Sequence, residues 1–448
     1  MTFSRRLGGI VCRGPRARFV IVAVAGVVGL LVGGGAGVAV GGGRDAVAQT
    51  QPASVDAAQS AEALGKLKEW LAAPADSRGK LVEQPWSKTA LSRADADAAE
   101  RLLWSDHSAR LKSDRSKEME AKVLKAGELE MPFWYKVNGE APEGGRSLYI
   151  SMHGGGGAPK QVNDQQWENQ KRLYSPAEGV YVAPRAPTNT WDLWHQSHID
   201  GLFDRLIENL VVFENVNPDR VYLMGYSAGG DGVYQVAPRM ADRFAAASMM
   251  AGHPNESQPL GLRNLPFSLH MGGLDGAYNR NKVAEQWGEQ LKKLREADPQ
   301  GYEHWVKIYA GKGHWMDRED AAAVPWMAKF TRNPFPNRIV WRQDDVTEAR
   351  FYWLGVSDEQ RKAGAEVRAH VDGRRITLDL KGVEQIKVRL HDRLLDLDQP
   401  LEIKIGEQTA FAGRVARTIA SQAASLAERA DPRSVWRGEV VVSAAASK

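Results

Sequence analysis

Cysteine is almost missing from this sequence. Its 448 residues include one, Cys12, so the chain beyond its first 48 residues has no disulfide, no thiolate nucleophile and no thiolate ligand for a metal. A strong excess of one charge is also missing, because 59 basic and 55 acidic side chains give a net charge of +4. A nucleic-acid partner is therefore not expected. Internal repeats and heptad arrays are absent from the sequence too, which excludes solenoids and coiled coils.

One long uncharged run is present, from Phe19 to Gly43, and it follows a basic start. The next residues include Ala46 to Ala48, which have the small-x-small form of a signal-peptidase site. The run would also span a bilayer if it were not removed, although its many glycines weaken its transfer energy. Two interpretations stay open, a cleaved signal peptide and an uncleaved membrane anchor. Both predict an exported protein, either secreted or held in the periplasm or cell envelope.

Length and composition predict several folded units, since 448 residues exceed one core of ordinary size. Leu64, Leu67 and Leu71 recur at helical spacing, and Ser92 followed by Asp95 has the form of a capping box. The proline-containing stretch TRNPFPN separates the central region from the rest. The predicted division is a leader at residues 1–48, a helical lead-in at 49–121, a central α/β domain at 122–332 and a β-rich C-terminal accessory domain at 333–448.

The central region alternates strand and helix patterns. Short apolar runs (SLYISM, VYVAP, VYLMG, AAASMMA, FSLHMG, WVKIYA) are separated by helical or loop stretches of suitable length. This alternation predicts a doubly wound, mostly parallel sheet, with KVLKA and LEMPFWYKV as an antiparallel pair at its edge. Beyond Phe330, runs such as RIVWRQ, RFYWLGV and RITLDL predict a small antiparallel β-domain, with a helix from Val415 to Glu428.

The strongest chemical motif is the stretch from Gly225 to Gly229, GYSAG, which lies directly between a predicted strand and a predicted helix. This GxSxG pattern in a strand-to-helix turn is typical of a nucleophile elbow, in which the hydroxyl of Ser227 is exposed. A tight structural turn is the alternative, because glycine and serine are common residues.

Another glycine-rich stretch, HGGGG from His153 to Gly157, ends an earlier predicted strand. Glycines let backbone N–H groups point at a developing negative charge without side-chain obstruction. The predicted oxyanion hole consists of the N–H of Ala228 and that of Gly155 or Gly156. A phosphate-binding loop is disfavoured, because no Lys-Ser or Lys-Thr follows the glycines.

A serine hydroxyl needs a base to accept its proton and a carboxylate to orient that base. Asp275 and His314 each follow a predicted strand, in the order Ser, acid, His that this kind of elbow requires. Three other acids compete for the role of Asp275. Asp231 and Asp242 lie in the helical segment after the elbow, and Asp317 is only three residues from His314.

The motifs HGGGG, GYSAGG, GGLD and GKGHW resemble the oxyanion, nucleophile, acid and base positions of the α/β-hydrolase superfamily. Within it, the region from Lys122 to Phe330 is similar to esterases such as polyhydroxyalkanoate depolymerases and feruloyl or acetylxylan esterases. The resemblance implies the α/β-hydrolase fold and an acyl-transfer mechanism, but specifies the substrate only weakly. It does not extend to the helical lead-in or the C-terminal region.

Loops rich in tryptophan and histidine follow strands on the same side of the sheet as these motifs. Tryptophans there stack on substrate rings or fix long loops by packing, and the sequence leaves both open. Histidines 195 and 198 have a spacing that a metal could use, but no third ligand is evident nearby, so no metal is expected. The chain between the AAASMMA and FSLHMG runs is too short for a large lid, which favours a bulky substrate. The predicted substrate-binding residues are Trp167, Trp191, Trp194, His195 and His253.

Three functions remain open on these residues. The leading expectation is an exported carboxylic-ester hydrolase that works through an acyl-enzyme on Ser227 without a cofactor, on an ester that can be polymeric or carbohydrate-linked. A serine peptidase resembling the prolyl oligopeptidase group would use the same residues. The third is a non-catalytic envelope protein that binds a polymer through its β-domain. Membrane contact is expected only through an uncleaved anchor.

Overall fold

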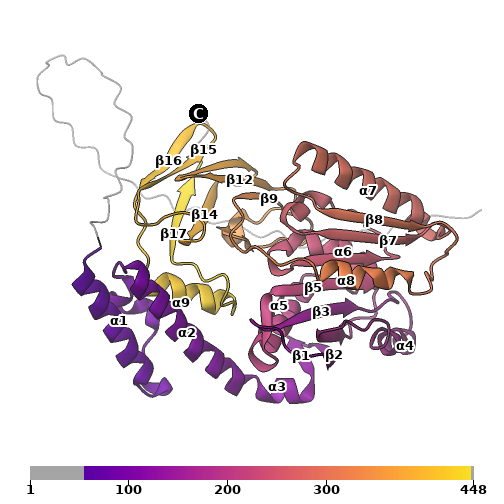
Figure 1. Ribbon diagram of the computed structural model, residues 1–448, viewed down its shortest axis with the longest axis horizontal. Coiled ribbons are helices and arrows are strands. Elements are labelled where there is room, and N and C mark those ends of the chain that lie inside the picture. Colours follow the sequence, from indigo (N-terminus) through magenta and orange to yellow (C-terminus); the bar gives the residue numbers. More distant parts are fainter. Residues whose placement is uncertain (1–54, 445–448) are drawn as a thin grey trace, which may run out of the picture. The chain divides into compact units, whose positions relative to one another are not determined.

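An eight-stranded sheet, called the central sheet because it comes from the central part of the sequence, is the largest in the computed structural model, which describes residues 55–444 (Figure 1). Its strand order is β1-β2-β4-β3-β5-β6-β7-β8, and every pairing from β4 to β8 is parallel. The pairs β1–β2 and β2–β4 are antiparallel, so the mostly parallel sheet and its antiparallel edge are confirmed. The strands are β1 (Val123–Ala126), β2 (Leu129–Asn138), β3 (Arg146–Met152), β4 (Gly179–Pro184), β5 (Val216–Tyr226), β6 (Ala246–Met250), β7 (Phe267–Gly272) and β8 (His304–Tyr309).

Helices cover both faces of this sheet, because its strands are apolar on both sides. Leu148 and Ile150 of β3 point to one face, where α5 (His198–Phe213), α6 (Ala228–Arg239) and α7 (Arg280–Ala297) pack. Tyr149, between them in sequence, points to the opposite face, which α4 (Lys160–Gln170) and α8 (Ala323–Met327) cover. The predicted alternation of strands and helices is confirmed, and it brings the carboxyl ends of the parallel strands to one edge.

The N-terminal part of the described chain is helical, as predicted. It forms α1 (Ala57–Ala72), α2 (Arg93–Asp114) and α3 (Ser116–Ala121). Ser92 caps α2 by accepting a hydrogen bond from the N–H of Asp95, whereas its own N–H donates to the hydroxyl of Ser60. The capping box is therefore completed by a neighbouring helix and not by Asp95.

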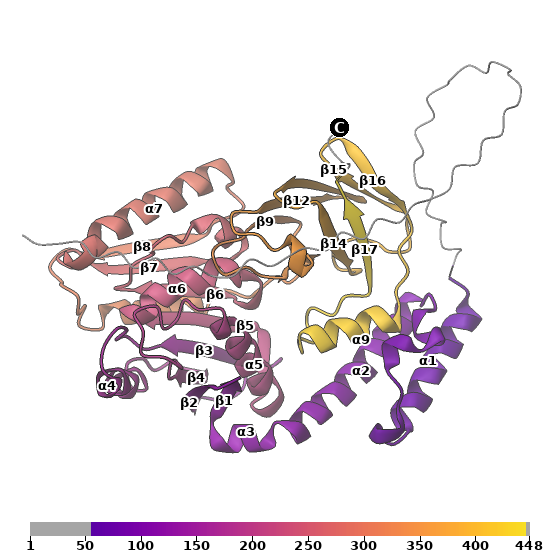
Figure 2. The ribbon, with the colours of Figure 1, turned by 180° about the vertical axis from the view of Figure 1, so that it is seen from behind.

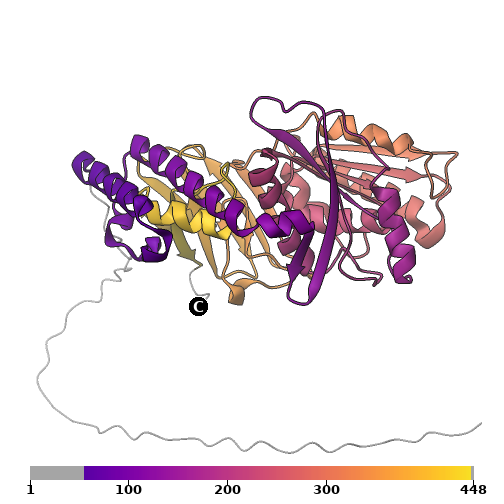
Figure 3. The same ribbon diagram turned by 90° about the horizontal axis from the view of Figure 1, so that it is seen from below.

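Near the other end of the chain, α9 (Ile419–Glu428) lies beside α2, which Figure 2 and Figure 3 show from two sides. The side-chain amide of Gln422 donates to the carbonyl of Ala96 across this contact. The helix begins four residues later than Val415, where its start was predicted, because Thr418 caps it through the N–H of Ser421. Segments distant in sequence thus form one helical layer.

The C-terminal strands form two sheets, with orders β16-β15-β13-β12-β9 and β10-β11-β14-β17. These sheets are antiparallel, as predicted, except that β13 and β15 pair in parallel. The run RFYWLGV is not one strand, because Tyr352 adopts φ 51° and turns the chain into the hairpin of β10 and β11. The strand β16 was not predicted. The strands are β9 (Arg338–Arg342), β10 (Arg350–Phe351), β11 (Leu354–Gly355), β12 (Glu366–Asp372), β13 (Arg375–Lys381), β14 (Gln385–Leu390), β15 (Leu401–Ile405), β16 (Gln408–Gly413) and β17 (Gly438–Ser443).

The described residues, 55–444, belong to one unit by their internal contacts, so the boundaries proposed at residues 121 and 332 remain a prediction. The leader at 1–48 lies outside the described residues. Within residues 55–444, no helix has both the length and the apolar character needed to cross a membrane.

Buried ion pairs join the C-terminal strands to the central sheet. The carboxylate of Asp242, which follows α6, accepts a hydrogen bond from the guanidinium of Arg429 at 2.6 Å and lies 3.9 Å from that of Arg350. Each of these three side chains is at most 6% exposed. Arg332 likewise pairs with Asp219 and with Asp431. Because a buried charge without its partner is costly, these pairs make the C-terminal strands part of the folded unit.

We expect Asp242→Asn to lower the free energy of unfolding by about 3 to 5 kcal/mol, since it removes a buried carboxylate that faces the buried guanidinium groups of Arg429 and Arg350. Urea unfolding at neutral pH measures the loss. The exposed Asp379 on β13 supplies the control, because Asp379→Asn removes the same charge from a solvated surface and should change stability by less than about 0.5 kcal/mol. Equal effects of the two substitutions would contradict a stabilising role for the buried pairs.

Candidate active site

Ser227 lies at the junction of β5, which ends at Tyr226, and α6, which begins at Ala228. Its backbone is strained, with φ 58° and ψ −123°, a conformation that a residue with a side chain rarely adopts. A Cβ at Gly225 would lie 2.2 Å from the carbonyl oxygen of Gly229, and one at Gly229 would lie 2.1 Å from that of Met152. The predicted sharp turn is therefore present, and it requires both glycines of the motif.

His314 and Asp275 complete a chain of hydrogen bonds with this serine. The Nε2 atom of His314 is 2.9 Å from the hydroxyl oxygen of Ser227, and its Nδ1 atom is 2.6 Å from the Oδ2 atom of Asp275. The side chain of Asp275 is 2% exposed, whereas that of His314 is 43% exposed. A buried carboxylate thus orients a histidine whose opposite nitrogen faces the serine at the open side of the site.

The three competing acids bind other groups. Asp231 accepts a hydrogen bond from the backbone N–H of His253, and burial raises the pKa of Asp231 to about 6. Asp317 forms an ion pair with Lys312 at 2.7 Å, and Asp242 belongs to the buried pairs described above. Within the described residues, Asp275 is the only carboxylate that contacts the imidazole of His314.

Tyr226 ties the loop that carries His314 to the serine turn. Its hydroxyl donates to the carbonyl oxygen of His314 at 2.5 Å and accepts from the N–H of Met316 at 3.3 Å. Burial raises the pKa of Tyr226, so its hydroxyl stays protonated and can donate. The sequence around Tyr226 did not predict that it binds the His314 loop, because that loop lies 88 residues later in the chain.

The glycine-rich stretch after β3 lies against Ser227, but only some of its N–H groups are free to bind an oxyanion. The N–H of Gly156 donates to the Oδ1 atom of Asn163 at 2.9 Å, so its assignment to the oxyanion hole is wrong. Gly155 has φ 110°, and a Cβ there would lie 2.1 Å from that same oxygen. Gly155 therefore remains the candidate donor from this loop, together with Ala228 at the start of α6.

His153 orients the glycine-rich loop through a side-chain hydrogen bond to its backbone. The N–H of Ala186 donates to its Nε2 atom, so the Nδ1 atom carries the proton and donates to the carbonyl oxygen of Gly154 at 2.6 Å. Burial lowers the pKa of His153 to about 3, which keeps the ring neutral. A Cβ at Gly154 would lie 3.0 Å from that of Ser227, so the histidine holds the chain where only glycine fits.

A cleft of about 650 Å³ opens beside the serine, and the sequence reasoning missed most of its wall. Trp315 directly follows His314 and is half-exposed in this wall. Arg172 and Arg318 also line the cleft. No sequence motif marks them, because one follows α4 and the other lies in the segment before α8. The side chains lining the cleft include Val162, Gln166, Asn169, Arg172, Leu173, Tyr226, Trp315 and Arg318.

The predicted substrate-binding residues differ in how exposed they are and in what their side chains contact. Trp194 is fully buried and its indole N–H donates to the carbonyl of His153, so its assignment to substrate binding is wrong. Trp167 donates to the carbonyl of Ala183 and does not line the cleft, so it too fixes a loop by packing. His195 is 7% exposed and packs edge-on against Trp191.

The remaining two predicted residues stay accessible near the site. Trp191 is 62% exposed, and its backbone packs against Gly156 and Gly157. His253 is partly exposed, and its ring contacts Asn255 and not Ser227. A role for either residue in binding substrate remains a prediction.

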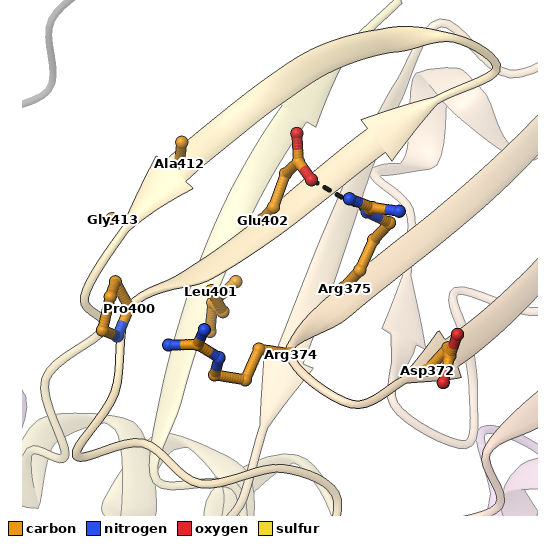
Figure 4. Close-up of a pocket in the computed structure, with 8 residues that line it drawn as sticks. All are labelled: Asp372, Arg374, Arg375, Pro400, Leu401, Glu402, Ala412 and Gly413. Atoms are coloured by element: carbon orange, nitrogen blue, oxygen red, sulfur yellow. Dashed lines mark hydrogen bonds and ion pairs between the residues drawn. The ribbon is translucent and has the colours of Figure 1, made fainter.

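Two further features bear on ligands. Among the described residues, no group of three or more His, Cys, Asp or Glu side chains is placed to hold a metal ion. A second hollow, of about 540 Å³, lies on the C-terminal sheet (Figure 4). There Arg375 is paired with Glu402 at 2.9 Å, and the wall contains no serine, cysteine or histidine. This hollow therefore lacks the kinds of side chain that surround Ser227.

The strand order, the serine turn after β5 and the helices on both faces define an α/β-hydrolase domain. Residues 182–330 match the dienelactone hydrolase family, and this stretch contains Ser227, Asp275 and His314. The central region accordingly has the α/β-hydrolase fold, and part of it is similar in sequence to the dienelactone hydrolase family. No curated protein is significantly similar to this chain in sequence.

Several solved structures are similar to this chain at low identity. They include a thermostable esterase (21% identity, 47% of this chain and 62% of that one, TM-score 0.36). A ferulic acid esterase matches at 14% identity, over 46% of this chain and 96% of that one, with a TM-score of 0.34. FphF, a fluorophosphonate-binding serine hydrolase of Staphylococcus aureus, matches at 12% identity over 46% and 96%, with a TM-score of 0.35. The chain spans less than two thirds of the length of the thermostable esterase.

Proposed function

We propose that this protein is an exported serine hydrolase that cleaves carboxylic esters through an acyl-enzyme on Ser227. The observation that carries the proposal is the unbroken chain of hydrogen bonds from Asp275 through His314 to a strained serine. The match to the dienelactone hydrolase family supports ester cleavage over other reactions.

The geometry supports a two-step reaction. Ser227 attacks the ester carbonyl as His314 takes its proton, and the N–H groups of Gly155 and Ala228 stabilise the oxyanion. His314 then gives the proton to the leaving alcohol, and water releases the acid by the same steps in reverse. Asp275 stays ionised throughout and stabilises the imidazolium that forms. These residues need no cofactor for either step.

The surroundings of the serine favour a bulky ester, including a polymeric or carbohydrate-linked one. Between β6 and β7 the chain forms only a short 3₁₀ helix, Pro259–Asn264, which packs against β9 and leaves no lid there. Large apolar side chains beside the site are exposed, namely Trp191 at 62%, Leu274 at 68% and Trp315 at 50%. An open cleft with an apolar rim accepts large substrates more readily than a closed one.

Hydrolysis assays test the proposal directly. The full chain should hydrolyse short acyl esters or feruloyl esters, and a phosphonate probe should label Ser227. Faster cleavage of dipeptidyl amides than of esters would instead support a serine peptidase. A folded protein that neither cleaves esters nor reacts with the probe would support the non-catalytic binding protein. Export is tested separately, by sequencing the N-terminus of the protein recovered from culture for cleavage after Ala48.

The pH dependence of activity should identify the base. We expect kcat/KM on one short-chain ester to rise over about pH 6 to 7, the range in which histidine side chains lose their proton. His314→Gln should remove this acidic limb together with the activity, because neutral His314 accepts the serine proton.

The partly exposed His253 and the buried His195 provide matched controls. His253→Gln and His195→Gln should retain the acidic limb even if they change KM, because neither ring contacts Ser227. Loss of the limb in the His253 variant alone would assign the base to that residue and contradict the proposed triad.

A further inference from the structure

Arg280, the first residue of α7, lies beside the buried carboxylate of the proposed triad. Its Nη1 atom is 4.0 Å from Oδ1 of Asp275, the oxygen that His314 does not contact. The side chain is 13% exposed, and within the described residues its Nε atom has no hydrogen-bond partner. The guanidinium carbon is 4.8 Å from the centre of the Tyr278 ring. The cation is therefore enclosed in the site and largely withheld from solvent.

An unusual turn brings Arg280 to this position. Tyr278 and Asn279 both adopt left-handed backbone conformations, with φ 54° and φ 57°. The backbone N–H of Asn281 donates to the carbonyl of Asp275 at 3.1 Å, and its side chain donates to that of Gly273 at 2.9 Å. Two consecutive strained residues persist only where their surroundings hold them. The loop after β7 thus folds back on itself and keeps Arg280 against the acid.

The cation faces more than one titratable group. On α6, Asp231 is partly buried, and its burial raises the pKa of its carboxyl while Arg280 opposes this shift. Burial, with a smaller contribution from Arg280, lowers the pKa of His253, whose backbone N–H donates to Asp231. The other groups near the imidazole are Tyr226 of β5, which binds the carbonyl of His314, and Asp317, which is paired with Lys312. Among these groups, the carboxylate of Asp275 is the one that lies within 4.0 Å of the Arg280 guanidinium.

We propose that Arg280 is a positioning residue that balances the buried charge of Asp275 and holds this carboxylate toward His314. A nearby positive charge disfavours the imidazolium, so it opposes the stabilisation that the carboxylate alone would give to that cation. It also offsets part of the cost of burying the carboxylate of Asp275. This inference rests on the proposed serine-hydrolase function and assigns a role to a residue outside the three-residue triad.

The test is the pH profile of kcat/KM for Arg280→Gln and Arg280→Lys on one short-chain ester. Removal of the charge in the Gln variant should move the acidic limb upward by about one pH unit and lower kcat by about tenfold or more. The Lys variant keeps a positive charge and should restore the limb to its wild-type position. A purely structural role would change activity without moving the limb, so an unmoved limb in a folded Gln variant overturns the proposal.

Lys282→Gln is the matched control, because Lys282 is an exposed cation in the same first turn of α7. It should leave the limb unchanged, since water and salt screen its charge. An equal shift in this variant would show a general charge effect and overturn the proposal. If Arg280→Gln does not fold, the Arg280→Lys variant tests the proposal. An acidic limb that lies one pH unit higher in the Lys variant than in the wild type would also overturn the proposal. Failure of the proposed function is distinct, since the wild type would then neither cleave esters nor react with a phosphonate.

Discussion

Ser227→Ala should abolish ester hydrolysis, with a loss of turnover on the order of 10⁶-fold, and leave the protein folded. The substitution deletes one hydroxyl oxygen from a partly exposed turn, so it removes the nucleophile but little buried area. The Cβ stays, and alanine has no larger penalty than serine at φ 58°. Turnover of a short acyl ester, labelling by a phosphonate and the circular dichroism spectrum together measure the outcome.

Ser175→Ala is the control for this variant. Ser175 is also exposed but does not line the cleft, so its loss should leave turnover unchanged. Near wild-type turnover in the Ser227 variant would end the serine-hydrolase interpretation. Loss of folding is not expected in either variant.

Asp275→Asn should lower kcat by about 10⁴-fold while the fold is retained. The Oδ2 atom of Asp275 lies 2.6 Å from Nδ1 of His314, so it holds the ring with its proton on that nitrogen. An asparagine amide placed there favours the other tautomer, which presents a proton and not a lone pair to the serine. Steady-state kinetics on a short acyl ester measure the effect.

Two other acids near the site offer matched controls. Asp231→Asn and Asp317→Asn should each have far smaller effects on kcat, because their carboxylates bind His253 and Lys312 and not the imidazole of His314. A loss of 10⁴-fold in the Asp317 variant, with little change in the Asp275 variant, would show that the acid has been assigned wrongly.

The central sheet was predictable because each of its strands is a short apolar run bounded by turn residues. Strands buried on both faces need apolar residues at every position, and that pattern is visible without neighbours. The C-terminal sheets were predicted less well. The turn at Tyr352 and Trp353 contains no glycine or proline, and β16 has no strong apolar pattern. Their pairing depends on partners elsewhere in the chain.

In the candidate active site, too, some residues could be predicted from the sequence and others could not. Ser227, Asp275 and His314 could be selected from the sequence because each follows a strand, and parallel strands end at one edge of the sheet. Trp194 was misassigned because sequence position places a loop near the site but does not say which of its side chains point inward. Gly156 was misassigned because its N–H is used by Asn163, a contact that no local pattern reveals.

The sequence by itself determined the class of fold and the three residues of the proposed triad, because apolar periodicity and strand-end motifs are local properties of the chain. Only the tertiary structure decided which backbone N–H groups stay free, which tryptophans are buried and which cation faces Asp275. Arg280 shows the reason most clearly. Its proximity to Asp275 depends on how a strained turn folds the chain back toward that residue, and the energy of a charge depends on what surrounds it in space.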